Sequence, residues 1–198
     1  MITESVARKV LEVVDAGLSK GLGAPAPGKM CVEAAVQYAL GGPHDDQPAC
    51  VAPALRAFKI RLNDACWSSN AARAKGLRRL ALIQLGSAGS LDEREFARRL
   101  ARLAIQFCVP YALRAVASFS EHKDKLLEAA DLCEREPTVE SARAAADAAY
   151  AAYAAYAAYN ANAAAADAFL SAFAEKVVQV LITMNVPGVR WLTLTEAA

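Results

Sequence analysis

The chain has 198 residues, of which 56% are hydrophobic and 22% are charged, and its formal net charge is +1. This length predicts one sizeable core or two small ones, and the composition excludes a disordered chain. Charged residues interrupt every apolar run before the 18 or so residues of a membrane span, and the amphipathic N-terminal segment contains acids. We therefore expect neither a membrane span nor a signal peptide.

The first part of the chain predicts two helices joined by a proline-containing connector. Thr3 is expected to cap a helix whose apolar residues recur at helical spacing and which ends at Gly21 or Gly23. Alternating prolines at 23–28 exclude a helix there, and a short helix follows over residues 30–40.

Two further helices are predicted by their start signals. Pro53 is compatible with a helix only within its first turn, so a helix begins near it. The sequence Trp67-Ser68-Ser69 predicts the cap of the next helix, which stops at Gly86. Ser90 and Glu93 have the spacing of a capping box and predict another helix start.

Prolines are expected to interrupt or end helices in the second half of the chain. Pro110 is expected to kink or break the helix that begins at Ser90, and Pro137 to end the helix after that. Thr138 or Ser141 is expected to cap an alanine-rich helix, and the tail over residues 190–198 is expected to be extended.

Together these patterns predict an all-α fold, because no strong alternating strand pattern occurs. We expect a single helical domain over residues 1–198, an irregular bundle of seven to nine helices with the alanine- and tyrosine-rich helix near its centre. A subdivision near residue 137 is the alternative, with a helical core at 1–136 and an alanine-rich hairpin at 138–184.

The segment DAAYAAYAAYAAYNANAAAADAF places a tyrosine at every third position of a strongly helix-forming run. On a helix, a step of three residues turns the side chain by 300°, so successive phenols shift by about 60° and form a spiral. We expect unequal environments for the four rings. The run is a central packed helix, a partner-binding ridge or a codon-slippage repeat. The tyrosines concerned are Tyr150, Tyr153, Tyr156 and Tyr159.

The segment over residues 29–51 holds the densest reactive chemistry. Cys31 lies at a helix start, where free amides lower a thiol pKa, and Lys29 adds positive charge. His44 is the base that a cysteine nucleophile would use, although a helix of about 16 Å separates the two residues. If the protein is an enzyme, its catalytic candidates are Cys31, Glu33, His44 and Asp46.

An alternative is a metal site made by His44, Asp46 or its neighbour Asp45, and Cys50. The spacing of these residues matches no strong ligand signature, so we predict no metal and no cofactor. The structural interpretation suits the same residues: the cysteines fill core positions at helix starts, and the acids lie in a solvated turn.

Several short motifs in this region occur together in a set of uncharacterised bacterial proteins. The chain resembles them in M-C-V-E-A-A (30–35), G-x-P-H-x-D (41–46), P-A-C-V (48–51) and the pair Asn63-Asp64. Alanine-rich helices with recurring aromatic residues follow this block in those proteins too. The resemblance implies no established activity and therefore no catalytic residues.

Charge is distributed unevenly along the chain. Residues 56–114 hold 12 Lys or Arg against 4 Asp or Glu, whereas residues 115–198 hold 6 against 11. The basic middle either binds nucleic acid or packs against the acidic C-terminal half. The candidate phosphate-binding residues are Arg78 on one predicted helix and Arg94, Arg98 and Arg102 on the next, with Arg73, Lys75, Arg79 and Arg99 beside them.

The sequence therefore predicts a non-catalytic, cytoplasmic helical protein that binds a macromolecular partner as an adaptor, inhibitor, immunity-type or phage-related accessory protein. Five widely spaced cysteines without a C-x-x-C pair suit a reducing compartment. A protein partner is expected, nucleic acid and a second copy of the chain are alternative partners, and no membrane is expected. The alternatives in function are a cysteine- or metal-dependent enzyme built on residues 31–50 and a nucleic-acid-binding protein using residues 73–102.

Overall fold

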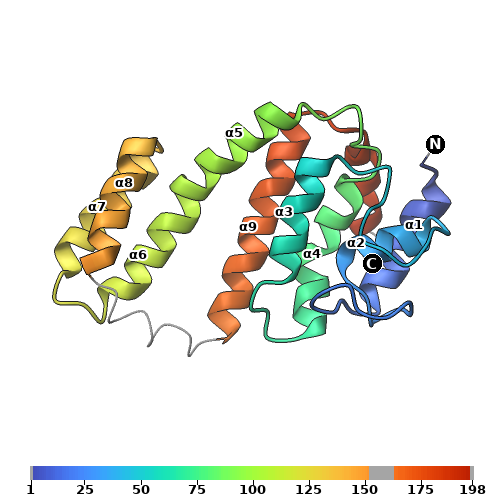
Figure 1. Ribbon diagram of the computed structural model, residues 1–198, viewed down its shortest axis with the longest axis horizontal. Coiled ribbons are helices and arrows are strands. Elements are labelled where there is room, and N and C mark those ends of the chain that lie inside the picture. The colour runs from blue at the N-terminus through green and yellow to red at the C-terminus, as the bar shows by residue number, and fades with distance from the viewer. Residues whose placement is uncertain (1, 152–162, 197–198) are drawn as a thin grey trace. The chain divides into compact units, whose positions relative to one another are not determined.

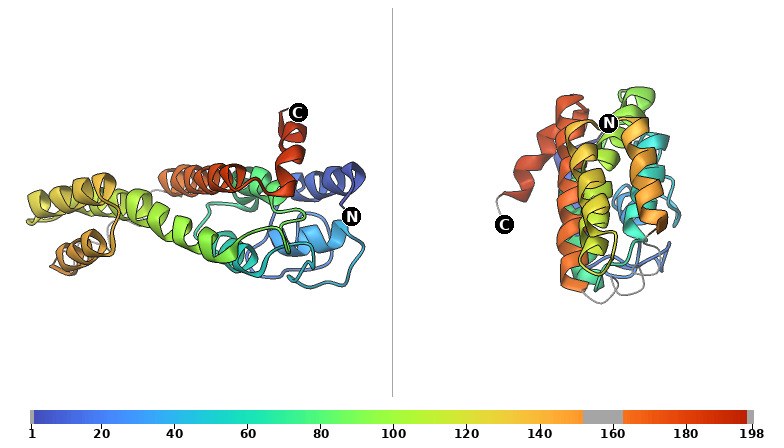
Figure 2. Two further views of the ribbon diagram at one scale, coloured as in Figure 1. Left: turned by 90° about the horizontal axis from the view of Figure 1, so that it is seen from above. Right: turned by 90° about the vertical axis from the view of Figure 1, so that its left-hand side faces the viewer.

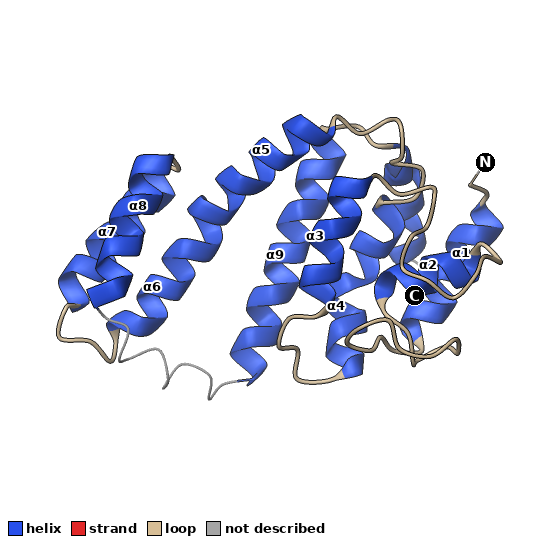
Figure 3. Ribbon diagram, viewed as in Figure 1, coloured by secondary structure: helices blue, strands red, loops and turns tan. Residues whose placement is uncertain are grey.

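A computed structural model describes residues 2–151 and 163–196 of the chain. Within these ranges the regular elements are helices, and no strand is formed beyond one isolated bridge between Gly23 and Met30 (Figure 3). The predicted all-α, multi-helix class is confirmed. The α-helices are α1 Glu4–Asp15, α2 Val32–Ala39, α3 Pro53–Asn63, α4 Asn70–Ile83, α5 Glu93–Leu103, α6 Val109–Ala117, α7 Lys123–Arg135, α8 Val139–Ala151 and α9 Ala163–Thr183.

Contacts divide the chain into two compact units (Figure 1). Unit 1 comprises residues 1–97 and 163–198, and unit 2 comprises residues 98–162. The alanine-rich segment contributes to both, with α8 in unit 2 and α9 in unit 1. The division does not coincide with the subdivision near residue 137 that the sequence suggested. Tyr150 lies in the last turn of α8, whereas Tyr153, Tyr156 and Tyr159 lie outside the described residues.

Helix α4 is the centre of unit 1. It packs against α1, α2, α9 and a 3-10 helix at Pro187–Thr195, and Leu77, Leu80 and Ile83 are fully buried. Gly76 permits a close approach, because a Cβ atom there would lie 2.4 Å from the ring of Trp67. Small residues at such positions let neighbouring elements pack closely.

Helix starts are largely set by local side chains, as the sequence predicts. The hydroxyl of Thr3 caps α1, and Oγ of Ser69 accepts a hydrogen bond from the N–H of Ala72 at 3.1 Å. The capping box at Ser90 was wrong, because Asp92 accepts from the N–H of Glu95 at 2.9 Å instead. The carboxylate of Glu93 does not bond back to Ser90. It accepts a hydrogen bond from the N–H of Ala54, in the first turn of α3, at 2.6 Å.

Two predictions, the end of the first helix and the conformation of the C-terminal tail, differ from the structure. Helix α1 ends at Asp15 and not at Gly21 or Gly23, because the backbone turns at Gly17 with a φ of 113°. The tail expected to be extended forms the 3-10 helix Pro187–Thr195. Gly188 lies so close to the carbonyl of Ile83 that this helix packs directly on the end of α4.

Unit 2 consists of α6, α7 and α8 together with the helical segment that precedes them (Figure 2). Its core is made largely of small residues. The side chain of Leu126, one of the larger residues in this core, has no exposed surface. Of the two effects expected of Pro110, a kink or a break, the break does not occur. A π-helical segment at Ala104–Cys108 precedes it, in which the N–H of Val109 bonds to the carbonyl of Ala104. This wider turn accommodates the proline ring, so the helix continues.

Candidate functional site

One of the predicted reactive residues of the 31–50 segment, Glu33, forms an ion pair with a residue of α3. Glu33 lies in the first turn of α2, and its Oε1 atom lies 2.9 Å from Nζ of Lys59. Neither side chain has any exposed surface. This is a buried ion pair, and neither group has a further hydrogen-bond partner among the described residues. Such a pair is costly to form and more costly to break.

Burial changes the proton affinity of both members of the pair. It raises the pKa of Glu33 and lowers the pKa of Lys59, and in each case the attraction of the other group acts in the opposite direction. Both shifts disfavour the charged form, as expected where water is excluded. The two charges therefore depend on each other.

A small cavity lies beside this pair. Its volume is about 40 Å³, and its polar lining consists of Cys31, Glu33, Asp46, Asn63 and Asp64. Its apolar lining consists of Gly21, Leu22, Val32 and Ile60. Residues from three of the four motifs on which the resemblance rests, those at 30–35, 41–46 and 63–64, thus line one cavity, although they are separated by up to 33 positions in sequence.

The side chain of Asn63 fixes the walls of this cavity. It is buried, accepts a hydrogen bond from the N–H of Val32 at 3.2 Å and donates to the carbonyl of Ser19 at 2.9 Å. Asp64 accepts from the N–H of Gly21 at 2.8 Å. These bonds tie the connector between α1 and α2 to the end of α3.

Arg73 supports the same region from α4. Its guanidinium donates to the carbonyls of Asn63 and Leu18, both at 2.8 Å, and is buried. A planar group with several donors suits this bridging role. Arg73 is therefore part of the fold of unit 1 and not of a basic surface.

Cys31 acts as the N-cap of α2, with Sγ accepting from the N–H of Ala34 at 3.4 Å. The helix amides lower its pKa, as the sequence analysis expected, but burial is the larger effect and raises it. His44 is exposed, and its Nε2 atom lies 3.1 Å from the carbonyl oxygen of Gly23. The structure thus shows each residue of the proposed dyad with a local backbone partner.

The structure does not arrange the residues proposed for a metal site as a set of ligands. No group of three or more His, Cys, Asp or Glu side chains in the described part of the chain is placed to hold a metal ion. Next to Asp46, Asp45 accepts from the side chain of Gln37 and from the N–H of Gln47, which closes the turn. Burial raises the pKa of Cys50.

The basic candidates divide into two groups. Arg78 binds the carboxylate of Asp15 through two nitrogens, at 2.7 and 3.1 Å, so it is used within unit 1. Arg94, Arg98 and Arg102 are exposed on α5 and are spaced by four residues. They share one face of that helix.

A larger groove lies in unit 2 between α7 and α8. Its volume is about 430 Å³. It is lined by Ala129, Leu132, Ala144 and Ala148 together with the charged or polar residues His122, Lys125, Glu128 and Asp147. Sequence analysis missed this groove, because neither helix carries a recognisable motif on that face.

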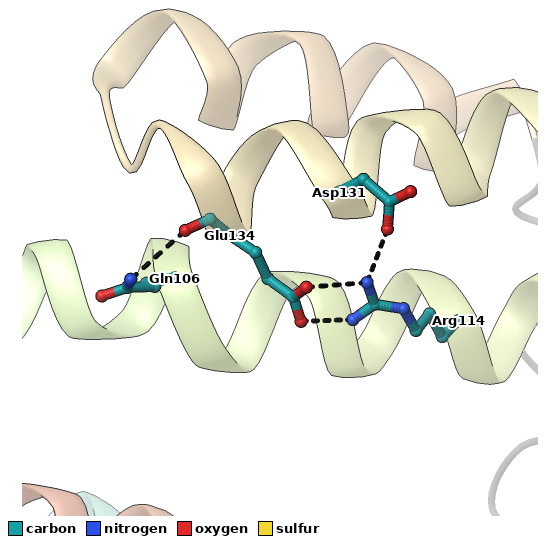
Figure 4. A network of polar contacts seen from close by, with 4 residues as sticks. All are labelled: Gln106, Arg114, Asp131 and Glu134. Carbon is teal, nitrogen blue, oxygen red and sulfur yellow. Dashed lines mark hydrogen bonds and ion pairs between the residues drawn. The ribbon is translucent and has the colours of Figure 1, made fainter.

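Polar contacts hold α7 against α6 (Figure 4). The guanidinium of Arg114 donates to both carboxylate oxygens of Glu134 and, at 2.7 Å, to Asp131. Gln106, within the π-helical segment, donates to the backbone carbonyl of Glu134 at 3.2 Å. These bonds fix the position of α7, which forms one wall of the groove.

Lys59 is the functional-site residue that the sequence analysis missed. Leu55, Lys59 and Leu62 recur at helical spacing on α3, and all three are buried. A lysine within an apolar stripe is the signal that could have identified it, since a buried ammonium requires a partner.

Among the residues that the structure describes, one helical stretch, Glu93–Ala117, is long and apolar enough to cross a membrane, with a mean hydropathy of 1.3 over its most apolar 18 residues. Length and composition alone do not establish a membrane span, so this stretch does not assign the protein to a membrane. Comparison of the chain with protein-family models, with curated proteins and with solved structures gave no match.

Proposed function

We propose that this protein is a non-catalytic helical protein that binds a protein partner through the groove between α7 and α8. The groove itself carries this proposal. Its apolar lining consists mostly of alanines, and charged side chains of both signs also line it. This arrangement suits an amphipathic helix, which places small apolar residues in a groove and its own charges at the rim.

Unit 2 has further features of a binding module. Its buried core contains few large side chains, whereas Phe119 is 62% exposed and Val139 is 57% exposed. A partner that covers these side chains would remove apolar surface from water. An adaptor, inhibitor, immunity-type or phage-related accessory role agrees with such a module.

The reactive residues of unit 1 favour the same conclusion over an enzyme. Cys31 caps a helix, Glu33 is paired with Lys59, and burial raises the pKa of the Cys31 thiol. A nucleophilic cysteine requires a lowered pKa or an adjacent base. Five free cysteines support our proposal of a cytoplasmic location.

The test uses two substitutions on one helix. Ala144 and Ala146 are both exposed on α8, but Ala144 lines the groove and Ala146 does not. Ala144→Glu should remove partners that the full-length protein captures from its native host, as measured by quantitative mass spectrometry. Ala146→Glu should retain them. If both variants keep the same partners, the groove is not the binding surface.

A second candidate function is nucleic-acid binding by α5. The observation that favours it is the exposure of Arg94, Arg98 and Arg102 on one face. A row of guanidinium groups can contact successive phosphates. Arg78 does not belong to this candidate, because Asp15 binds its guanidinium.

A further inference from the structure

The small cavity of unit 1 contains an unexplained group. Oε1 of Glu33 faces Lys59, but its other oxygen, Oε2, lacks a hydrogen-bond partner in the described part of the chain, although Glu33 has no exposed surface. The same side chain lines the cavity. Buried carboxylate oxygens are nearly always hydrogen-bonded, so this oxygen indicates a ligand that donates a hydrogen bond to it.

The remaining polar lining is rich in acceptors. Asp46 and Asp64 add two carboxylates, and the amide hydrogens of Asn63 are directed to the carbonyl of Ser19 and to Oδ1 of Asp64. Lys59 is the cation in contact with Glu33. Arg56 and Arg73 act on Glu33 and Asp64 through longer-range attraction. The lining therefore favours a ligand that is positively charged and rich in donors.

Size restricts the ligand further. A volume of about 40 Å³ accommodates about three water-sized groups, taking 10–15 Å³ for each. Metal coordination is not supported, since the described acids and cysteines form no group that could hold a metal ion. A compact cation that donates hydrogen bonds in several directions meets both conditions.

We propose that this cavity binds a primary ammonium group, with Glu33, Asp46 and Asp64 as its acceptors. Among the lining residues, Leu22 is 40% exposed and Asp46 and Asp64 are half-buried, so a ligand would approach from their side. An ammonium ion can enter alone, or the charged end of an alkylamine can enter with its chain against Leu22 and Ile60. The cavity belongs to unit 1, so this proposal is independent of the groove in unit 2.

Backbone amides beside the cavity provide the measurement. The N–H groups of Gly21 and Val32 bond to Asp64 and Asn63, so their NMR resonances report on the cavity. The full-length protein is titrated at constant pH and ionic strength with ammonium, methylammonium, butylammonium and tetramethylammonium chlorides. Methylammonium should shift both resonances saturably, with a Kd of about ten millimolar or weaker for so small a ligand. Tetramethylammonium lacks N–H donors and should cause no saturable shift.

Two neighbouring substitutions provide the matched control. Asp46→Asn removes a cavity carboxylate and should weaken methylammonium binding by about tenfold, the loss expected for one charge-assisted hydrogen bond. Asp45→Asn removes the same charge one residue away but keeps an acceptor for Gln37 and Gln47, and its Kd should be unchanged.

The other outcomes either distinguish a free ammonium ion from the end of a longer amine or show that the cavity is not an ammonium site. Tighter binding of butylammonium would identify the end of a longer amine, and binding of ammonium alone would identify the free ion. Linear shifts with every salt, or equal Kd values for Asp46→Asn and Asp45→Asn, would overturn the proposal and leave a cavity that holds water.

Discussion

The Nζ atom of Lys59 lies 2.9 Å from Oε1 of Glu33, and neither side chain has any exposed surface. Lys59→Met would leave a buried carboxylate without its counter-charge. We expect a loss of about 3–5 kcal/mol in the free energy of unfolding, measured by urea denaturation. The double variant Glu33→Leu with Lys59→Met should recover most of this loss, because no charge then remains buried.

Lys75→Met is the control for this experiment, since Lys75 is exposed on α4. Its effect should be within about 0.5 kcal/mol. Equal losses for Lys59→Met and Lys75→Met would show that the pair is not buried in solution.

Thiol reactivity should follow burial and not the position of a cysteine in a helix. Cys66 is exposed, whereas burial raises the pKa of Cys31 and raises that of Cys108 from 9.0 to about 11. The thiolate fraction of Cys108 at pH 7 is then lowered by about a hundredfold. Mass spectrometry after brief alkylation should show Cys66 modified first. Fast modification of Cys31 near pH 6 would instead support the cysteine-enzyme alternative.

Gly76→Ala should destabilise unit 1 even though alanine favours helices. The new methyl group would lie 2.4 Å from the ring of Trp67 and 2.7 Å from Oγ of Ser171. Overpacking of this kind costs about 1–3 kcal/mol, more than the gain of about 1 kcal/mol in helix propensity. Thermal melting should show a lower Tm, and a higher Tm would mean that α4 and its neighbours are packed less closely.

The ion pair between Arg114 and Glu134 predicts a dependence on pH. Arg114 lowers the pKa of Glu134 below its usual value of 4.5. The stabilisation is therefore present above pH 4.5 and is lost as the pH falls through the lowered pKa. Both side chains are partly exposed, so Glu134→Gln should cost less than about 1 kcal/mol at pH 7.

Hydrogen exchange of the α7 amides can measure this effect. The difference between the wild type and Glu134→Gln should disappear well below pH 4.5. Glu128→Gln, on the same helix and exposed, should show no such change. A difference between wild type and Glu134→Gln that persists in acid would mean that it does not arise from the ion pair.

If α5 binds nucleic acid, Arg98→Glu combined with Arg102→Glu should weaken binding to any DNA or RNA sequence and reduce the salt dependence. Arg78→Glu should instead lower stability, because it places a carboxylate against Asp15. Fluorescence anisotropy at several salt concentrations can measure the first effect, and thermal melting the second. Absence of binding at low salt would exclude this function.

Most helices could be predicted from the sequence, because apolar spacing and capping residues act over a few positions. Thr3 and Ser69 cap their helices by contacts within three residues, and Pro137 directly follows Glu136, the C-cap of α7. The start of α5 was misplaced because Glu93 binds Ala54, 39 residues away. No local pattern contains that contact.

The candidate site was only partly predictable for the same reason. The sequence identified Cys31, Glu33 and Asp46 as one reactive region but not Lys59, which pairs with Glu33 from α3. The position of Cys31 at a helix start was correct, yet burial determines the direction of its pKa shift. Burial is a property of the assembled unit. The resemblance to uncharacterised bacterial proteins and the unequal tyrosine environments stay predictions.

The discontinuity of unit 1 has a consequence for synthesis on the ribosome. Helix α4 packs against α9, but residues 98–162 of unit 2 lie between them in sequence. All of unit 2 is therefore translated before α9, while α4 still lacks that neighbour. Because domains generally fold as units during translation, the inserted unit can fold first, and the unit that contains the N-terminus is completed last.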